Sequence, residues 1–261
     1  MIVGFALASV SIVPMRSEPN HKAEQVSQIL FGERMIVLSK TKNDWFLVRC
    51  EWDKYEGWVK GGQITFIADK IYKRKLAALS ISHQDVILQP DGQFFLSPGS
   101  SLFLLKGKKI EWNPYFSYKG KKVFFKDAGF EPDKFSECCK LFLGSPYLWG
   151  GRGMMGMDCS GFSQVVFKLF NYKLPRDASQ QAKVGEPVDF LQEAKCGDLA
   201  FFDNDEGNIN HVGILLNSNT IIHGTETSGC VIIDSIDNNG IISRKKRMRT
   251  HNLRLVKRYF N

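Results

Sequence analysis

The chain has 261 residues, 43% of them hydrophobic and 24% charged, with a formal net charge of +8. This length and apolar content allow a substantial core and one to three domains. Six cysteines in a chain of this size exclude a disulfide scaffold, and most of them are expected to be buried thiols, as in a reducing compartment.

The N-terminal segment Met1–Val13 is apolar but lacks a basic flank. Its apolar run is shorter than the roughly 20 residues that span a bilayer. We therefore predict a first β-strand rather than a signal peptide, and no stable insertion into a membrane. A cytoplasmic location follows, with a periplasmic location as the alternative if a signal peptide had been removed.

Short β-rich runs separated by turn-rich or charged segments occupy residues 1–68. The runs are Ala6–Val13, Arg34–Ser39, Trp45–Glu51 and Gly57–Lys60. With the flanking Val13–Pro19 and Tyr55–Val59 they resemble a bacterial SH3-like barrel, which we expect over residues 1–70. A second SH3-like domain over 71–130 is predicted from three weaker runs, namely Val86–Gln89, Ser101–Leu105 and Lys122–Phe125. Such barrels usually bind a ligand and do no chemistry alone.

Residues 131–261 are predicted to form a third domain, whose first helix starts at Glu131-Pro132-Asp133. Its most informative residue is Cys159. Apolar residues follow it at helical spacing, namely Phe162, Val165, Val166, Leu169 and Phe170. Asp158 is a good N-cap residue, so Cys159 should lie in the first helical turn, where free N–H groups and the helix dipole favour a thiolate nucleophile. The alternative is a half-buried structural cysteine.

Two histidines flank a predicted β-hairpin downstream. His211 opens the run 211–216 and His223 closes the run 220–223, with Asn217-Ser218-Asn219 as the turn. If Leu216 pairs with Thr220, Gly213 lies opposite His223, and His211 is its diagonal neighbour on the same face. A thiol hydrolase needs one imidazole as a base and a second polar group that fixes its tautomer.

Six ordered motifs resemble the NlpC-type cell-wall cysteine peptidases, over roughly residues 131–261. The motifs are Ser145–Gly151, Asp158–Phe162, Leu174–Asp177, Gly197–Phe202, His211–Ile214 and Ile222–Gly224. The resemblance implies an α+β architecture: a papain-like NlpC-type catalytic domain preceded by one or two small SH3-like β-barrels. It further implies Cys159 as the nucleophile, His211 as the base and His223 as the orienting residue. The Tyr147 hydroxyl and the Cys159 backbone N–H would form the oxyanion site. Cys196 departs from the usual proline, which affects loop stiffness rather than chemistry.

The order of domains resembles the γ-D-glutamyl-L-diamino acid endopeptidases that recycle stem peptides. The resemblance implies that Glu18, Tyr55 and Asp177 bind the free amine of the leading L-alanine, because an ammonium group needs acceptors and negative charge. For Glu18 and Tyr55 the alternative is a structural role, with Glu18 as a turn carboxylate and Tyr55 as a packing residue of a strand.

Three further residues of the matching motifs are candidates for substrate binding: Trp149, Asp158 and Ser160. Ser160 would hold the α-carboxylate of D-Glu, or alternatively serve as a second N-cap hydroxyl. Ala178 stands where some relatives have a serine, so one substrate contact differs.

The resemblance therefore predicts a cysteine endopeptidase that cleaves the γ-D-Glu–diamino acid bond of free L-Ala-γ-D-Glu-diamino acid peptides, in murein peptide recycling and without a metal or cofactor. One alternative is a cell-wall-peptide-binding protein with an inactive catalytic domain. Another is an amidase or acyltransferase with the same Cys–His chemistry. The sequence leaves open the diamino acid, the ligand of the second SH3-like region and the oligomeric state.

The positive charge is concentrated near the C-terminus. Eight of the 35 Lys and Arg residues lie within 244–258, and the remaining 27 equal the 27 acidic residues. The run alternates into apolar residues, which predicts a solvated loop leading to a terminal strand. Attraction of an anionic cell-wall peptide is favoured over nucleic-acid binding, and no nucleic-acid partner is expected.

Overall fold

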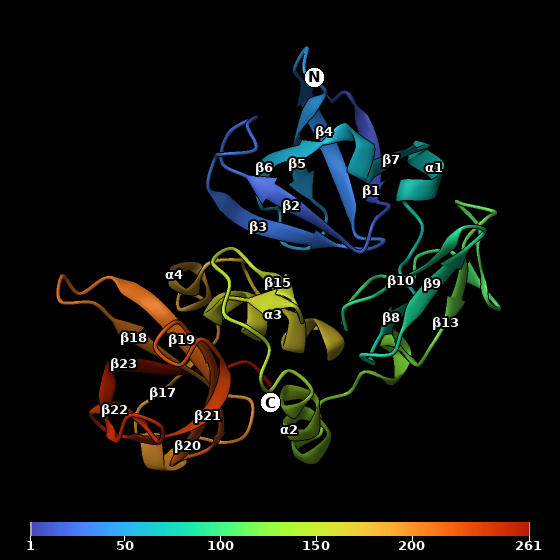
Figure 1. Ribbon diagram of the computed structural model, residues 1–261. Helices are drawn as coiled ribbons and strands as arrows, with labels where there is room; N and C mark the ends of the chain where they lie inside the picture. The colour runs from blue at the N-terminus through green and yellow to red at the C-terminus, as the bar shows by residue number, and fades with distance from the viewer. Residues whose placement is uncertain (1, 261) are drawn as a thin grey trace. The chain divides into compact units, whose positions relative to one another are not determined.

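The computed structural model describes residues 2–260 (Figure 1). The chain divides into two compact units. The first comprises the residues up to Gly129 together with Gly150–Met154 and Asn171–Lys173, and the second comprises Phe130–Trp149, Met155–Phe170 and the residues from Leu174 onward. Two short segments that lie within the predicted third domain by sequence thus pack in the first unit. No helix of the described residues has both the length and the apolar character needed to cross a membrane.

The N-terminal part of the first unit is a small barrel of seven strands, drawn in blue in Figure 1. Its strands are β1 (Gly4–Ala8), β2 (Ile12–Arg16), β3 (Gln25–Leu30), β4 (Arg34–Lys40), β5 (Trp45–Cys50), β6 (Glu56–Lys60) and β7 (Ile64–Ile67), with a 3-10 turn η1 at Gly61–Gln63. Their order in the sheet is β3-β2-β6-β5-β4-β1-β7. Alternate residues of β2 and β4 are buried, such as Val13, Met15, Met35 and Val37, because successive side chains of a strand point to opposite faces.

The predicted N-terminal strand is present but is shorter than the apolar segment. Strand β1 ends at Ala8 and a second strand begins at Ile12, so the run up to Val13 contains a turn. Met1 lies outside the described residues. Strands β3 and β7 were not predicted, because β3 has a polar composition and β7 is only four residues long.

A buried ion pair attaches the segment 150–154 to the barrel within the first unit. Arg152 donates to the two carboxylate oxygens of Glu33 at 2.8 and 3.1 Å, and both side chains are buried. Its Nη1 also donates to the carbonyl of Gln28 at 2.8 Å. The Gln28 amide oxygen in turn accepts from the backbone N–H groups of Arg152 and Gly153. Burial alone would lower the pKa of Arg152, but Glu33 raises it on balance.

The remainder of the first unit has its own sheets and core. The elements are α1 (Asp69–Tyr72), β8 (Ala78–Ser80), β9 (Val86–Gln89), β10 (Gly92–Phe95), β11 (Leu105–Lys106), β12 (Lys109–Ile110), β13 (Ser117–Lys119), β14 (Lys122–Phe124), the 3-10 turn η2 (Phe125–Asp127), and β15 (Arg152–Gly153). Five strands pair in the order β10-β9-β13-β12-β11, and β14 pairs with β8. Ile87, Ile110 and Tyr118 pack together with Phe31 in one core. Of the predicted 101–105 run, only Leu105 is in a strand.

The second unit combines helices with a seven-stranded antiparallel sheet, seen in orange and red in Figure 1. Its elements are α2 (Pro132–Lys140), β16 (Gly156–Met157), α3 (Cys159–Leu169), α4 (Ala178–Gln181), β17 (Glu186–Val188), the 3-10 turn η3 (Leu191–Glu193), β18 (Leu199–Asp203), β19 (Ile209–Asn217), β20 (Thr220–Thr225), β21 (Cys230–Asp237), β22 (Gly240–Ser243) and β23 (Met248–Arg258). The sheet order is β17-β23-β18-β19-β20-β21-β22. Helix α3 is buried along its whole length and contacts β19 and β20.

The basic segment 244–258 is mostly sheet. The structure places only the exposed residues 244–247 in a turn, and β23 begins at Met248. Three of its cations meet carboxylates of neighbouring elements: Arg249 with Asp237 at 2.7 Å, Arg254 with Asp203 at 3.7 Å, and Arg258 with Asp198 at 2.7 Å. The structure therefore has the expected solvated loop leading to a terminal strand, with the loop limited to residues 244–247. The sequence did not indicate the acidic partners, because they come from distant positions in the chain.

Candidate active site

Cys159 is the first residue of α3, as predicted. The carboxylate of the N-cap residue Asp158 accepts a hydrogen bond from the backbone N–H of Gly161 at 2.6 Å. This bond satisfies one of the N–H groups that a helix leaves unpaired in its first turn. The helix ends one residue earlier than the apolar pattern, with Phe170 as its C-cap.

A buried arginine holds the first turn of α3. Arg176 donates to the two oxygens of Asp158 at 2.6 and 3.1 Å and to the Ser160 hydroxyl at 2.9 Å. The Ser160 hydroxyl donates to Asp158 at 3.2 Å. Asp158, Ser160 and Arg176 are all buried. Two of the candidate substrate-binding residues thus belong to a network that fixes the turn carrying Cys159, and their contact with a substrate stays a prediction.

The hairpin brings His211 and His223 together. Ile214 pairs with Ile222, a register that places Gly213 opposite His223 as predicted. The predicted pairing at the turn is wrong by one residue, because a bulge at Leu216 makes Asn217 the partner of Thr220. A Cβ added at Gly213 would lie 2.6 Å from Cδ1 of Ile221 and 3.0 Å from the Cβ of His223, so the close approach of β20 favours a residue without a side chain here.

The two imidazoles form a hydrogen-bonded pair that ends on a carboxylate. His211 Nε2 lies 2.8 Å from His223 Nδ1, and His223 Nε2 lies 3.3 Å from Asp234 Oδ2. All three side chains are buried. This contact agrees with the expected pairing of a base with an orienting residue, and it extends the pair by one further residue, Asp234.

Cys159 begins α3, the helix that contacts β19 and β20, and the backbone N–H of Val212, the residue after His211, favours its thiolate. Burial and the neighbouring Asp158 carboxylate raise the pKa of the Cys159 thiol to about 12, against the opposing effect of the Val212 N–H. Burial and the neighbouring His251 hold the pKa of His211 well below its usual range. Burial therefore opposes the helix dipole, which favours the thiolate, and on balance it raises the pKa of the Cys159 thiol.

Tyr147 is attached to the segment that precedes Cys159. Its neighbour Leu148 donates a backbone hydrogen bond to Met157 at 3.0 Å, and its own N–H donates to Gly229 at 2.8 Å. Burial, with Cys159 and Asp158 nearby, raises the pKa of the Tyr147 phenol. The hydroxyl therefore keeps its proton at neutral pH, as a hydrogen-bond donor must.

The remaining predicted site residues differ in their surroundings. Trp149 is 62% exposed in the second unit. Asp177 is the N-cap of α4 and forms a capping box with Gln180, so its carboxylate has a structural role as well. Glu18, which is exposed, and Tyr55, which packs against the barrel core, belong to the first unit.

Three residues at the site were missed by the sequence analysis. Asp234 interrupts the apolar run 231–233, and a charged residue in such a run was an available signal. Arg176 was quoted within a motif but given no role. His251 lies in the basic segment, and its ring stacks on His211 with centroids 4.1 Å apart. No local pattern links His251 to the site, because the two histidines are 40 positions apart.

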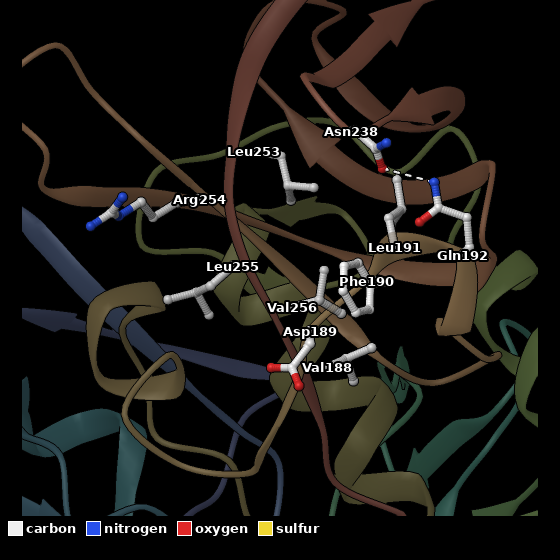
Figure 2. Close-up of a pocket in the computed structure, with 10 residues that line it drawn as sticks. All are labelled: Val188, Asp189, Phe190, Leu191, Gln192, Asn238, Leu253, Arg254, Leu255 and Val256. Atoms are coloured by element: carbon white, nitrogen blue, oxygen red, sulfur yellow. Dashed lines mark hydrogen bonds between the residues drawn. The ribbon is translucent and has the colours of Figure 1, made fainter.

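A separate cavity of about 280 Å³ lies in the second unit (Figure 2). It is lined by Val188, Asp189, Phe190, Leu191, Gln192, Asn238, Leu253, Arg254, Leu255 and Val256. None of the candidate catalytic residues contributes to it. The close-up shows a hydrogen bond from Gln192 to Asn238 across one side, at 3.2 Å. We assign the chemistry to the Cys159 and His211 region, because a cavity without a nucleophile or base cannot supply it.

A cysteine at the tip of a buried helix, beside two paired histidines on an antiparallel sheet, defines a thiol hydrolase of the papain-like class. Residues 144–250 match the NlpC/P60 family, and residues 15–64 match the bacterial dipeptidyl-peptidase Sh3 domain. The chain belongs to the NlpC/P60 family of cysteine peptidases, with an N-terminal SH3-like region.

Curated relatives extend over most of the chain. The chain is 30% identical over 232 residues to the gamma-D-glutamyl-L-lysine dipeptidyl-peptidase of Bacillus subtilis (strain 168), covering 79% of this chain and 74% of that one. It is 27% identical over 242 residues to the protein of the same name from Bacillus cereus, covering 83% and 72%. Among solved structures, an NlpC/P60 family protein from Bacillus cereus has a TM-score of 0.83 at 20% identity, covering 99% and 100% of the two chains. This structural similarity confirms the fold.

Proposed function

We propose that this peptidase hydrolyses the bond between the γ-carbonyl of D-Glu and the diamino acid in free L-Ala-γ-D-Glu-diamino acid peptides, in the cytoplasmic recycling of cell-wall peptides. The observation that carries the reaction type is the buried pair of His211 and His223 beside Cys159, with a contact of 2.8 Å between the rings. The substrate class is supported by two relatives that are named as gamma-D-glutamyl-L-lysine dipeptidyl-peptidases.

Acylation begins with proton transfer from the Cys159 thiol to His211. The Nε2 atom of His211 faces His223, so Nδ1 is the nitrogen that takes the proton. The sulfur bonds to the γ-carbonyl carbon, and the carbonyl oxygen becomes an oxyanion. The Tyr147 hydroxyl and the Cys159 N–H donate to it, each such donor being worth about 3 kcal/mol.

The tetrahedral intermediate then collapses. Its C–N bond breaks, His211 returns the proton to the departing diamino-acid amine, and a thioester on Cys159 remains. In the second half, His211 takes a proton from water, the resulting hydroxide equivalent attacks the thioester, and the C–S bond breaks. The dipeptide leaves with a free γ-carboxylate, and the thiol recovers its proton from His211.

Specificity for released peptides would come from recognition of the free amine of L-Ala. We propose that Glu18, Tyr55 and Asp177 supply acceptors for this ammonium group, and that Trp149 and Ser160 contact the peptide. In intact wall that nitrogen is an amide and carries no charge. Binding of such a substrate would leave the carboxylates of Glu18 and Asp177 without a cation to pair with, and this disfavours it.

The defining experiment is hydrolysis of L-Ala-γ-D-Glu-L-Lys and L-Ala-γ-D-Glu-meso-diaminopimelate by the purified full chain, followed by chromatography of the released dipeptide. We expect cleavage at the γ-bond of at least one of the two. The control is the isomer with an α-linked glutamate, which should be resistant. Absence of cleavage of both γ-linked tripeptides by a folded protein would contradict the proposed substrate.

A further inference from the structure

Asp234 lies on β21 at the end of the contacts that begin at His211, and it is 1% exposed. Its register partner on β20 is Ile221, so its side chain is a diagonal neighbour of His223 on the same face. Its two carboxylate oxygens contact different partners. Oδ1 accepts from the backbone N–H of Arg244 at 2.8 Å, and Oδ2 contacts Nε2 of His223 at 3.3 Å.

These contacts determine which ring nitrogens carry protons in the neutral histidine pair. An ionised carboxylate only accepts hydrogen bonds, so Nε2 of His223 must carry the hydrogen that faces Asp234. Nδ1 of a neutral His223 then has a lone pair, and Nε2 of His211 must be the donor in the 2.8 Å contact. Nδ1 of His211 is left with a lone pair, which is the form that can take a proton from a thiol.

We propose that Asp234 is a positioning residue that sets the tautomers of His223 and His211, and thereby keeps Nδ1 of His211 unprotonated toward Cys159. Among the tests of this role, only the measurement of kcat rests on the proposed function. It is an addition to the three residues Cys159, His211 and His223, because Asp234 touches neither the nucleophile nor the base and acts through His223.

The surroundings of Asp234 favour this role over a purely structural one. The hydrogen bonds of Ser243 to the backbone N–H groups of Lys246 and Arg247 already stabilise the turn from which Arg244 donates. The Arg244 N–H is a donor fixed in the backbone, so it holds Oδ1 in place and leaves Oδ2 for His223. The histidine His251, which packs against both imidazoles, contacts Thr250 through its Nδ1 at 2.9 Å.

Asp234→Asn tests the proposal directly, because it keeps the size of the side chain and removes the charge. The Arg244 N–H requires an oxygen, so the amide oxygen must face Arg244 and the NH₂ group must face His223. His223 Nε2 would then have to accept, its hydrogen would move to Nδ1, and His211 would be left with its hydrogen on Nδ1. The base is thereby blocked. Asp234→Ala imposes no tautomer, although it leaves a cavity and an unpaired N–H.

The expected order of activity is therefore wild type, then Asp234→Ala, then Asp234→Asn, with kcat of the Asn variant lower by about 100-fold or more and KM nearly unchanged. The control is Asp237→Asn on the same strand, whose carboxylate bonds Arg249 and lies outside the histidine pair. We expect its kcat within about twofold of the wild type. A role of Asp234 in packing alone predicts the opposite order, with the Ala variant as the less active one, and that order would overturn the proposal.

Two readouts do not depend on the substrate. Nitrogen-15 NMR of the imidazole groups should show both rings protonated at Nε2 in the wild type and at Nδ1 in Asp234→Asn. Alkylation of Cys159 by iodoacetamide at pH 7.5 should slow in the Asn variant in parallel with kcat. If the Asn variant has the same tautomers and the same alkylation rate as the wild type, the assignment is refuted. This test does not require cleavage of a γ-D-glutamyl peptide, so it remains valid if the proposed substrate is wrong.

Discussion

The imidazole of His251 lies on the imidazole of His211, with the ring centroids 4.1 Å apart and the planes inclined by 23°. Strand β23 supplies His251 and strand β19 supplies His211, with Phe202 of β18 in contact with both rings. A base in this position is shielded on one face by an uncharged ring. Burial and the neighbouring His223 lower the pKa of His251 to about 4.

Acid should destabilise the second unit through these two histidines. The folded-state pKa values of His211 and His251 lie below the unfolded value of about 6.5, so the unfolded chain takes up protons first as the pH falls. The contribution of these two histidines to the free energy of unfolding is therefore fully present above pH 7 and is lost as the pH falls from 6.5 to about 4. In His251→Phe, which keeps an aromatic ring, the loss measured by urea unfolding at pH 7.5 and 4.5 should be smaller by about 2 kcal/mol. His83→Gln, an exposed control in the first unit, should lose as much as the wild type. Equal losses in all three proteins would show that His251 does not titrate in this window.

Cys159 is expected to be indispensable. Cys159→Ala removes the nucleophile and should reduce hydrolysis of the γ-linked tripeptides by about 10⁴-fold or more, with the melting temperature nearly unchanged. Cys138→Ala is the matched control, because Cys138 is also a buried free thiol but lies in α2, away from the histidines. The measurement is the rate of dipeptide release. Substantial activity in Cys159→Ala would contradict the mechanism.

The reactivity of Cys159 should increase with pH far above neutrality. A thiol pKa of about 12 means that the resting thiol is protonated, so each alkylation event requires transfer of its proton to His211. The rate of modification by iodoacetamide, followed by peptide mass spectrometry, should therefore show no plateau between pH 6 and 9. His211→Gln should lower it at pH 7.5 by about tenfold or more. A rate that is already maximal at pH 6 would instead indicate a standing thiolate–imidazolium pair.

Recognition of the free amine can be tested by removing one charge at a time. Glu18→Gln and Asp177→Asn keep the shape of each side chain and should lower kcat/KM for free tripeptide by about 10- to 100-fold, since a charge-assisted hydrogen bond contributes roughly 1.5–3 kcal/mol. Alkylation of Cys159 should be unaffected in both variants. The matched control is Glu24→Gln in the same part of the chain as Glu18. If the wild type cleaves the tripeptide and its N-acetylated form at equal rates, the protein has no site that recognises the free amine of L-Ala.

The buried pair of Arg152 and Glu33 should be a main determinant of stability in the first unit. Glu33→Gln leaves the guanidinium buried without its counter-charge, which costs about 3 kcal/mol or more. The exposed pair of Arg49 and Glu56 offers a control, and Glu56→Gln should cost less than about 0.5 kcal/mol. Denaturation followed by tryptophan fluorescence reports mainly on this unit, because Trp45, Trp52, Trp58 and Trp112 lie in it. Equal midpoints for the two variants would contradict this assignment.

The sequence by itself determined the features that depend on neighbouring residues. The apolar spacing after Cys159 and the capping residue Asp158 predicted α3, because helical period and N-cap chemistry are local properties. The runs around His211 and His223 predicted the hairpin and the register at the site, since a slip of one residue would move apolar side chains out of the core. At the turn the same reasoning was wrong by one residue, because short polar turns admit bulges.

Tertiary structure decided what surrounds these residues. The site also contains Asp234, His251 and Arg176, which lie on strands and loops whose local sequence patterns do not indicate a site. Antiparallel pairing brings such residues together from positions far apart in the chain. It also decided the surroundings that shift the pKa of Cys159. The position at a helix tip favours a thiolate, but burial beside Asp158 favours the thiol and raises its pKa, and the extent of that burial depends on packing against distant parts of the chain.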